Sequence, residues 1–105
     1  MVWRLRAAGG IFVSMNIGEL IVKSAETCGG RARVAGHRVA VFRVAMAFRA
    51  GNSPEEMLAM WPSLSLAEIH AAIAYSLANA AEIEADIAAE ERAWERTEAR
   101  TQAVS

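Results

Sequence analysis

The sequence predicts a small, mainly α-helical protein in which short N-terminal β strands precede a helix-turn-helix three-helix core and a C-terminal helix. Three observations support this fold class. The chain has 105 residues, which is enough for one modest hydrophobic core. Its residues are 54% hydrophobic but only 7% aromatic, which favours closely packed, Ala-rich helices over a β sandwich. From about Ala40 onward, apolar residues recur with helical spacing.

The region before Ala40 predicts two short strands. Leu20–Val22 is a β-prone run, and a second extended stretch, Arg31–Val34, follows the turn signal Cys28-Gly29-Gly30. A lone two-stranded unit is marginally stable in water. We therefore expect this β arm to pack on the helices or to pair with a second chain.

The first predicted helix runs from about Ala40 to Gly51, because Gly commonly follows the last residue of a helix. Spacing at i, i+3, i+4 and i+7 predicts one buried face and one exposed face. The predicted buried residues are Val41, Val44, Ala45 and Phe48, and the predicted opposite face includes Arg43 and Ala47.

Two further helices have clear N-terminal signals. Ser53-Pro54-Glu55-Glu56 and Ser65-Leu66-Ala67-Glu68 are capping boxes, in which Ser caps the first turn and the later Glu reaches back. Pro62 limits the first of these helices, so a tight turn joins the two, as in a helix-turn-helix. In the later helix we expect buried Leu66, Ile69, Ile73 and Leu77, and outward-facing Glu68, Ala71, Ala72, Tyr75 and Asn79.

After Asn79 the chain contains no Gly or Pro, which predicts one more helix. Like charges four residues apart, such as Glu82 and Asp86, each destabilise an isolated helix by a few tenths of a kcal/mol. We therefore expect this helix to need a partner to be well ordered. The predicted organisation is an N-terminal extension (1–14), the β arm and helical core (15–81), and an acidic C-terminal helix and tail (82–105), with Met15 as an alternative start of translation.

Charge is distributed unevenly along the chain. Through Gly51, eight Lys or Arg residues stand against two acids, a net charge of +6, whereas the remainder has three Arg and ten acids, a net charge of −7. A basic first half suits a polyanion, and an acidic second half suits a protein partner.

The chemistry-bearing residues do not indicate an enzyme or a metalloprotein. Cys28 is the only cysteine, so no intrachain disulfide forms, and a reducing cytoplasm is the expected compartment. Cys28, His37 and His70 lack paired metal-ligand spacing and lack a nucleophile-base arrangement. No stretch free of charged side chains reaches the roughly 20 residues of a membrane span. We expect a cytoplasmic, non-enzymatic protein without a cofactor or a membrane partner.

The run from Cys28 to Val41, CGGRARVAGHRVAV, resembles the signature of domain-of-unknown-function family four-three-three, a group that includes VapB-like antitoxins. Gly51–Glu56, Pro62–Ser65 and Ile69–Tyr75 match the later family pattern in order and spacing, so the resemblance covers Leu20 to about Ile87. Ala32 and His37 stand where the family usually has Pro and Thr. The resemblance implies a helix-turn-helix fold and, for several members, pairing with a PIN-like ribonuclease toxin that the antitoxin silences.

The leading hypothesis is an antitoxin-like protein, dimeric or of higher order, that binds a PIN-like ribonuclease and operator DNA and so regulates its own operon. The segment Leu66–Leu77 contains no Lys or Arg. Contacts to DNA are therefore expected from Arg31, Arg33, Arg38 and Arg43. The expected toxin contacts are Tyr75, Ile83, Ile87, Arg92, Trp94, Arg96 and Arg100, with one of the arginines plugging an acidic active site. The alternatives are a stand-alone helix-turn-helix regulator and a dimeric interaction module that binds no DNA.

Overall fold

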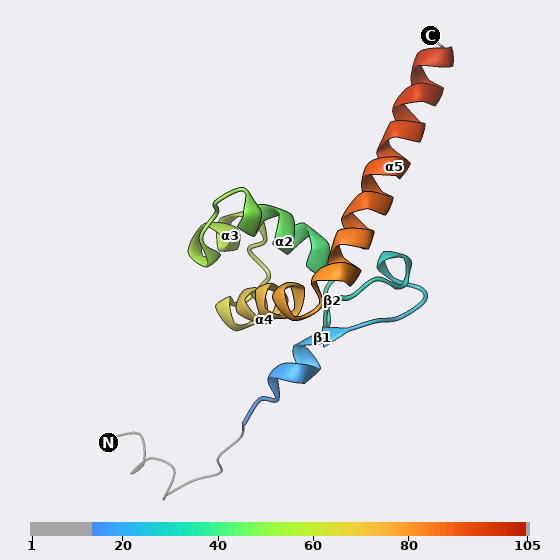
Figure 1. The fold of residues 1–105 in the computed structure, drawn as a ribbon. Helices are drawn as coiled ribbons and strands as arrows, with labels where there is room; N and C mark the ends of the chain where they lie inside the picture. Colours follow the sequence, from blue (N-terminus) through green and yellow to red (C-terminus); the bar gives the residue numbers. More distant parts are fainter. Residues whose placement is uncertain (1–13, 105) are drawn as a thin grey trace, which may run out of the picture.

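The computed structural model describes residues 14–104, and its fold is mainly helical with a short two-stranded sheet (Figure 1). This confirms the predicted fold class. Residues 1–13 of the predicted N-terminal extension lie outside the described residues. None of the described helices is both long enough and apolar enough to cross a membrane. Two 3-10 helices and the strands come first, followed by four α-helices: η1 (Ile17–Leu20), β1 (Ile21–Val22), η2 (Cys28–Gly30), β2 (Arg33–Val34), α2 (Val41–Arg49), α3 (Pro54–Met60), α4 (Leu66–Ala78) and α5 (Ala80–Val104).

The two predicted strands form an antiparallel pair. Ile21 faces Val34, and Val22 faces Arg33. The strands are shorter than predicted, because Leu20 belongs to η1 and residue 31 precedes β2. Val34 is fully buried in the hydrophobic core, so the arm is stabilised by packing on the helices. The turn between the strands takes a left-handed backbone at Cys28 and both following glycines, with φ of 54°, 64° and 79°.

The two predicted capping boxes are present. The Ser53 hydroxyl accepts from the Glu56 amide at 3.1 Å, and the Glu56 carboxylate accepts from the Ser53 amide at 2.7 Å. Ser65 and Glu68 repeat the arrangement at 3.1 and 2.8 Å. Each box satisfies two amides that the first helical turn leaves without partners. The sequence of the short turn between α3 and α4 therefore fixes the residue at which α4 begins.

The predicted buried face of α2 is correct in part. Val41, Val44 and Ala45 are buried, but Phe48 is 41% exposed and Ala47 is buried. The reason is that α2 contacts α3, α4 and α5, so its buried arc is wider than a single helical stripe. The carbonyl of Ala47 also accepts from the side chain of Asn52, which brings the chain back over this residue after α2.

The predicted faces of α4 need a larger correction. Ile69 and Ile73 are buried as expected, whereas Leu66 and Leu77 are 38% and 67% exposed. Ala71 and Ala72, predicted to face outward, are buried. This helix packs against α2, α3 and the β arm, and small side chains allow such close approach on several sides. Ala71 and Ala72 are therefore part of the core.

The last helix has two parts with different surroundings (Figure 1). We call residues 80–90 the α5 root and residues 91–104 the α5 outer half. Ile83 and Ile87 in the root belong to the core. In the outer half every residue with a described side chain is exposed except Ala93, which is half-buried. Figure 1 shows the outer half extending away from the other helices.

Candidate partner-binding site

Ion pairs between the basic first half of the chain and the acidic α5 root hold α5 in place. Lys23 pairs with Glu82 at 3.1 Å, and Arg49 pairs with Glu84 at 2.6 Å. Glu90 bridges Arg31 at 3.1 Å and Arg43 at 3.4 Å. Some of the opposite charges of the two halves are thus paired within one molecule. These ion pairs give the α5 root support that neighbours along the helix do not supply. The expectation that the helix needs a partner to be well ordered stays a prediction for the outer half.

A second group of contacts fixes the junction between α4 and α5. The Tyr75 hydroxyl donates to both oxygens of the Glu82 carboxylate, at 3.0 and 2.9 Å. Burial, followed by this hydrogen bond, raises the pKa of Tyr75 above its ordinary value. The hydrogen bond from Lys23 to Glu82 raises the pKa of Lys23. The polar end of Tyr75 is therefore engaged within the chain, although the sequence predicted a partner contact there.

The four arginines predicted to bind DNA have different surroundings. Arg33 donates to the His37 carbonyl at 3.1 Å and to the Ser24 hydroxyl at 3.2 Å, so it holds the loops of the β arm together. Arg31 and Arg43 both lie over the Phe42 ring, 5.3 and 5.4 Å from its centroid, and share Glu90. The exposed side chain of Arg38 has no hydrogen bond or ion pair with the described residues. Arg33 is thus a structural residue, and the other three arginines form a separate group.

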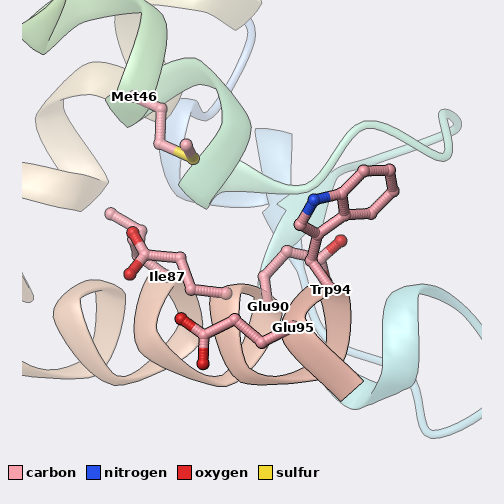
Figure 2. Close-up of a pocket in the computed structure, with 6 residues that line it drawn as sticks. Met46, Ile87, Glu90, Trp94 and Glu95 are labelled. Atoms are coloured by element: carbon pink, nitrogen blue, oxygen red, sulfur yellow. The ribbon is translucent and has the colours of Figure 1, made fainter. Parts of the chain in front are cut away.

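An open groove of about 330 Å³ lies where the α5 root meets α2 (Figure 2). Figure 2 shows the Met46 side chain pointing from α2 toward α5, with Ile87 beneath it and Trp94 farther along α5. Trp94 is 64% exposed, and its Nε1 donates to Glu98 at 3.0 Å. We call this surface the Trp94 groove; its lining residues are Met46, Ile87, Glu90, Glu91, Trp94 and Glu95.

The predicted partner-binding residues of α5 differ in their exposure. Ile83 is fully buried, so it supports the fold and is not available to a partner in this conformation. Ile87 is 8% exposed and contributes only an edge to the groove. Trp94 and the arginines at positions 92, 96 and 100 are exposed on the outer half. The sequence interpretation missed Met46 and Glu90, because no local pattern indicates that α2 and α5 meet.

The three residues considered as metal ligands lie apart. His37 pairs with Glu68 at 3.3 Å, the Cys28 thiol donates to the Arg38 carbonyl at 3.4 Å, and His70 is exposed. Within residues 14–104, no three His, Cys, Asp or Glu side chains are grouped in a way that suits a metal ion.

Comparison with known proteins places this fold in a family. The model of the family described as "Protein of unknown function (DUF433)" matches residues 21–76, just over half of the chain. The chain belongs to the DUF433 family. The match ends before α5, so both the α5 root and its outer half lie beyond the matched residues. The family resemblance predicted from the sequence is confirmed.

Two individual proteins are similar to this DUF433 member. The uncharacterized protein y4eO of Sinorhizobium fredii is 43% identical over 61 residues, which are 58% of this chain and 28% of that protein. This chain therefore spans only about 28% of the length of that relative. The crystal structure of a DUF433 member from Anabaena variabilis has the same fold, with a TM-score of 0.62 and 24% identity over 83% of this chain and 77% of that one.

Proposed function

We propose that this DUF433 protein is an antitoxin-like adaptor that binds a PIN-like ribonuclease through the α5 outer half and the Trp94 groove. One observation carries the proposal: a helix rooted in the core extends beyond the body and exposes a large aromatic side chain beside an apolar groove. Aromatic side chains at such positions are typical anchors of protein interfaces. Binding of operator DNA, cytoplasmic location and oligomerisation remain expectations of the same proposal.

The root makes the exposed helix suitable for binding. Ile83 and Ile87 are packed in the core, and the Glu82, Glu84 and Glu90 carboxylates are paired with the body. A helix held in this way loses less conformational freedom when a partner binds its outer half. The binding energy of Trp94 is then used for association and is not spent on forming the helix.

The arginines proposed to plug an acidic active site lie on another face of α5. Arg92 and Arg96 stand two positions before and after Trp94, about 200° around the helix axis. A single flat partner surface cannot contact both faces. The proposal therefore requires a ribonuclease that wraps around the outer half, with its acidic site on the arginine face and an apolar surface against Trp94.

The test uses the product of the neighbouring reading frame, which the proposal expects to be a PIN-like ribonuclease. We expect Trp94→Ala to weaken its binding by about 2 kcal/mol or more, because it removes an aromatic anchor that the partner would bury. Leu77→Ala is the matched control, since Leu77 is 67% exposed but lies outside the groove. Isothermal titration calorimetry gives both affinities. Equal losses for the two variants, or unchanged binding of Trp94→Ala, would contradict the proposed interface.

The arginine plug has its own readout. Arg92→Ala, Arg96→Ala and Arg100→Ala are tested singly and together for residual ribonuclease activity at saturating adaptor. If the triple variant still inhibits fully, none of the three arginines is the plug. Sequence-specific operator binding without any ribonuclease would favour the stand-alone regulator. Absence of DNA binding together with self-association through α5 would favour the dimeric interaction module.

A further inference from the structure

We infer that Arg31, Arg38 and Arg43 form a binding site for a phosphate group and that the Glu90 carboxylate acts as an internal competitor for this site. The three arginines line a hollow of about 210 Å³, which Glu90 and the ring of Phe42 also line. We call it the arginine hollow. The inference rests on the proposed function only for the identity of the macromolecule that supplies the phosphate. The contacts of the three arginines support the site itself.

The carboxylate of Glu90 already shows what kind of group the arginines accept. One of its oxygens accepts from Arg31 at 3.1 Å, and the other lies 3.4 Å from Arg43. A carboxylate and a phosphate present similar anionic oxygens to a guanidinium, and arginine binds both. One carboxylate leaves this group of three arginines with a net charge of +2. The exposed guanidinium of Arg38 adds donors that no described residue uses.

Packing holds the arginines in position before a ligand arrives. The guanidinium groups of Arg31 and Arg43 both lie against the Phe42 ring, and Phe42 itself is only 3% exposed. Such stacking limits the conformations of two long side chains, so less entropy is lost on binding. The first turn of α2 has neither a side-chain cap nor an acidic residue, and its N-terminus adds partial positive charge beside the hollow.

The site differs from the predicted DNA-binding set in two ways. Arg33 is excluded, because its guanidinium bonds to the arm loops. Glu90 is added as an opposing residue, which no local sequence pattern reveals, since it lies 59 positions from Arg31. Glu90 also lines the Trp94 groove, so the two sites share one side chain.

The experiment measures binding of the full chain to two probes, a fluorescein-labelled 20-base-pair duplex and inorganic phosphate. Fluorescence anisotropy over a range of salt concentrations gives the duplex affinity. NMR signals of the Arg side-chain NH groups report phosphate binding. We expect Arg38→Ala to reduce the slope of log affinity against log salt by about 0.9, the value for one lost phosphate contact. Arg49→Ala, at an exposed arginine of α2 that does not line the hollow, is the control and leaves the slope unchanged.

Glu90→Gln provides the decisive comparison. It removes the competing charge, and we expect the duplex to bind about fivefold more tightly, since a neighbouring unit charge is no longer repelling the phosphate. Glu84→Gln is the matched control, because it also removes one carboxylate of the α5 root that pairs with an arginine of α2. Circular dichroism verifies that each variant is folded.

Each outcome decides the proposal. Tighter duplex binding by Glu90→Gln alone, with a reduced slope for Arg38→Ala, supports a nucleic-acid phosphate as the ligand. Phosphate binding that depends on Arg38 and Glu90, without duplex binding, supports the site with a free phosphate as its source and removes the DNA part of the proposed function. Equal effects of Glu90→Gln and Glu84→Gln, or no binding of either probe, would overturn the inference.

Discussion

The root and the outer half of α5 belong to one continuous helix but have opposite relations to the rest of the molecule. In the root, two isoleucines enter the core and three glutamates pair with the basic half of the chain. In the outer half, charged side chains surround an exposed Trp94. One continuous helix can therefore have two roles. Contacts with other elements make the root structural, and the exposure of the outer half leaves it available for binding.

The largest expected difference between the two parts concerns hydrophobic burial. Ile83→Ala should lower the free energy of unfolding by about 2–5 kcal/mol, because it leaves a cavity in the core. Trp94→Ala should change the same quantity by no more than about 0.5 kcal/mol, because its side chain is already 64% exposed. Urea denaturation followed by circular dichroism measures both. A comparable loss for Trp94→Ala would show that the outer half packs on the body.

A smaller effect is expected at the junction that orients the root. Tyr75→Phe removes the hydroxyl that donates to Glu82 and should lower the free energy of unfolding by about 1 kcal/mol. Glu98→Gln in the outer half, which affects only a local contact with Trp94, is the comparison and should have a weaker effect. Thermal unfolding monitored by circular dichroism separates the two.

The same junction also predicts the direction of an alkaline pH effect. The pKa of Tyr75 is raised above its ordinary value of 10.0, chiefly by burial, so folding favours the protonated phenol. This stabilisation is fully present below pH 10 and is lost as the pH rises through the folded-state value. Tyr75 is the only tyrosine, so tyrosinate absorbance reports its titration directly. A Tyr75 titration midpoint at or below 10 would contradict the burial of this side chain and its hydrogen bond to Glu82.

The smallest expected effect concerns the Glu90 carboxylate, which pairs with both Arg31 and Arg43. Glu90→Gln weakens two partly exposed ion pairs and should lower the free energy of unfolding by about 0.5–1 kcal/mol. Glu95→Gln in the outer half removes the same charge without breaking an ion pair in the described structure and should have little effect. Denaturation at low and high salt tests this, because added salt should remove most of the difference. Equal stability of the two variants at low salt would mean that the Glu90 ion pairs do not help to hold the root.

The sequence by itself determined the local structure of this protein. Ser and Glu at capping-box spacing located the starts of α3 and α4, Gly51 marked the end of α2, and the extended runs flanking Cys28 predicted the β arm. These signals are reliable because each one acts through hydrogen bonds or backbone angles within a few residues. The family resemblance likewise rested on residues that the sequence displays directly.

Only the tertiary structure decided which faces are buried and which charges are free. The Ala71 and Ala72 face is internal because several elements approach α4, and Glu90 pairs with Arg31 and Arg43 across 59 and 47 positions of sequence. Helical periodicity describes one helix at a time and contains no information on its neighbours. The Trp94 groove and the arginine hollow arise where separate elements meet, so the packing of α5 against α2 and the β arm creates both.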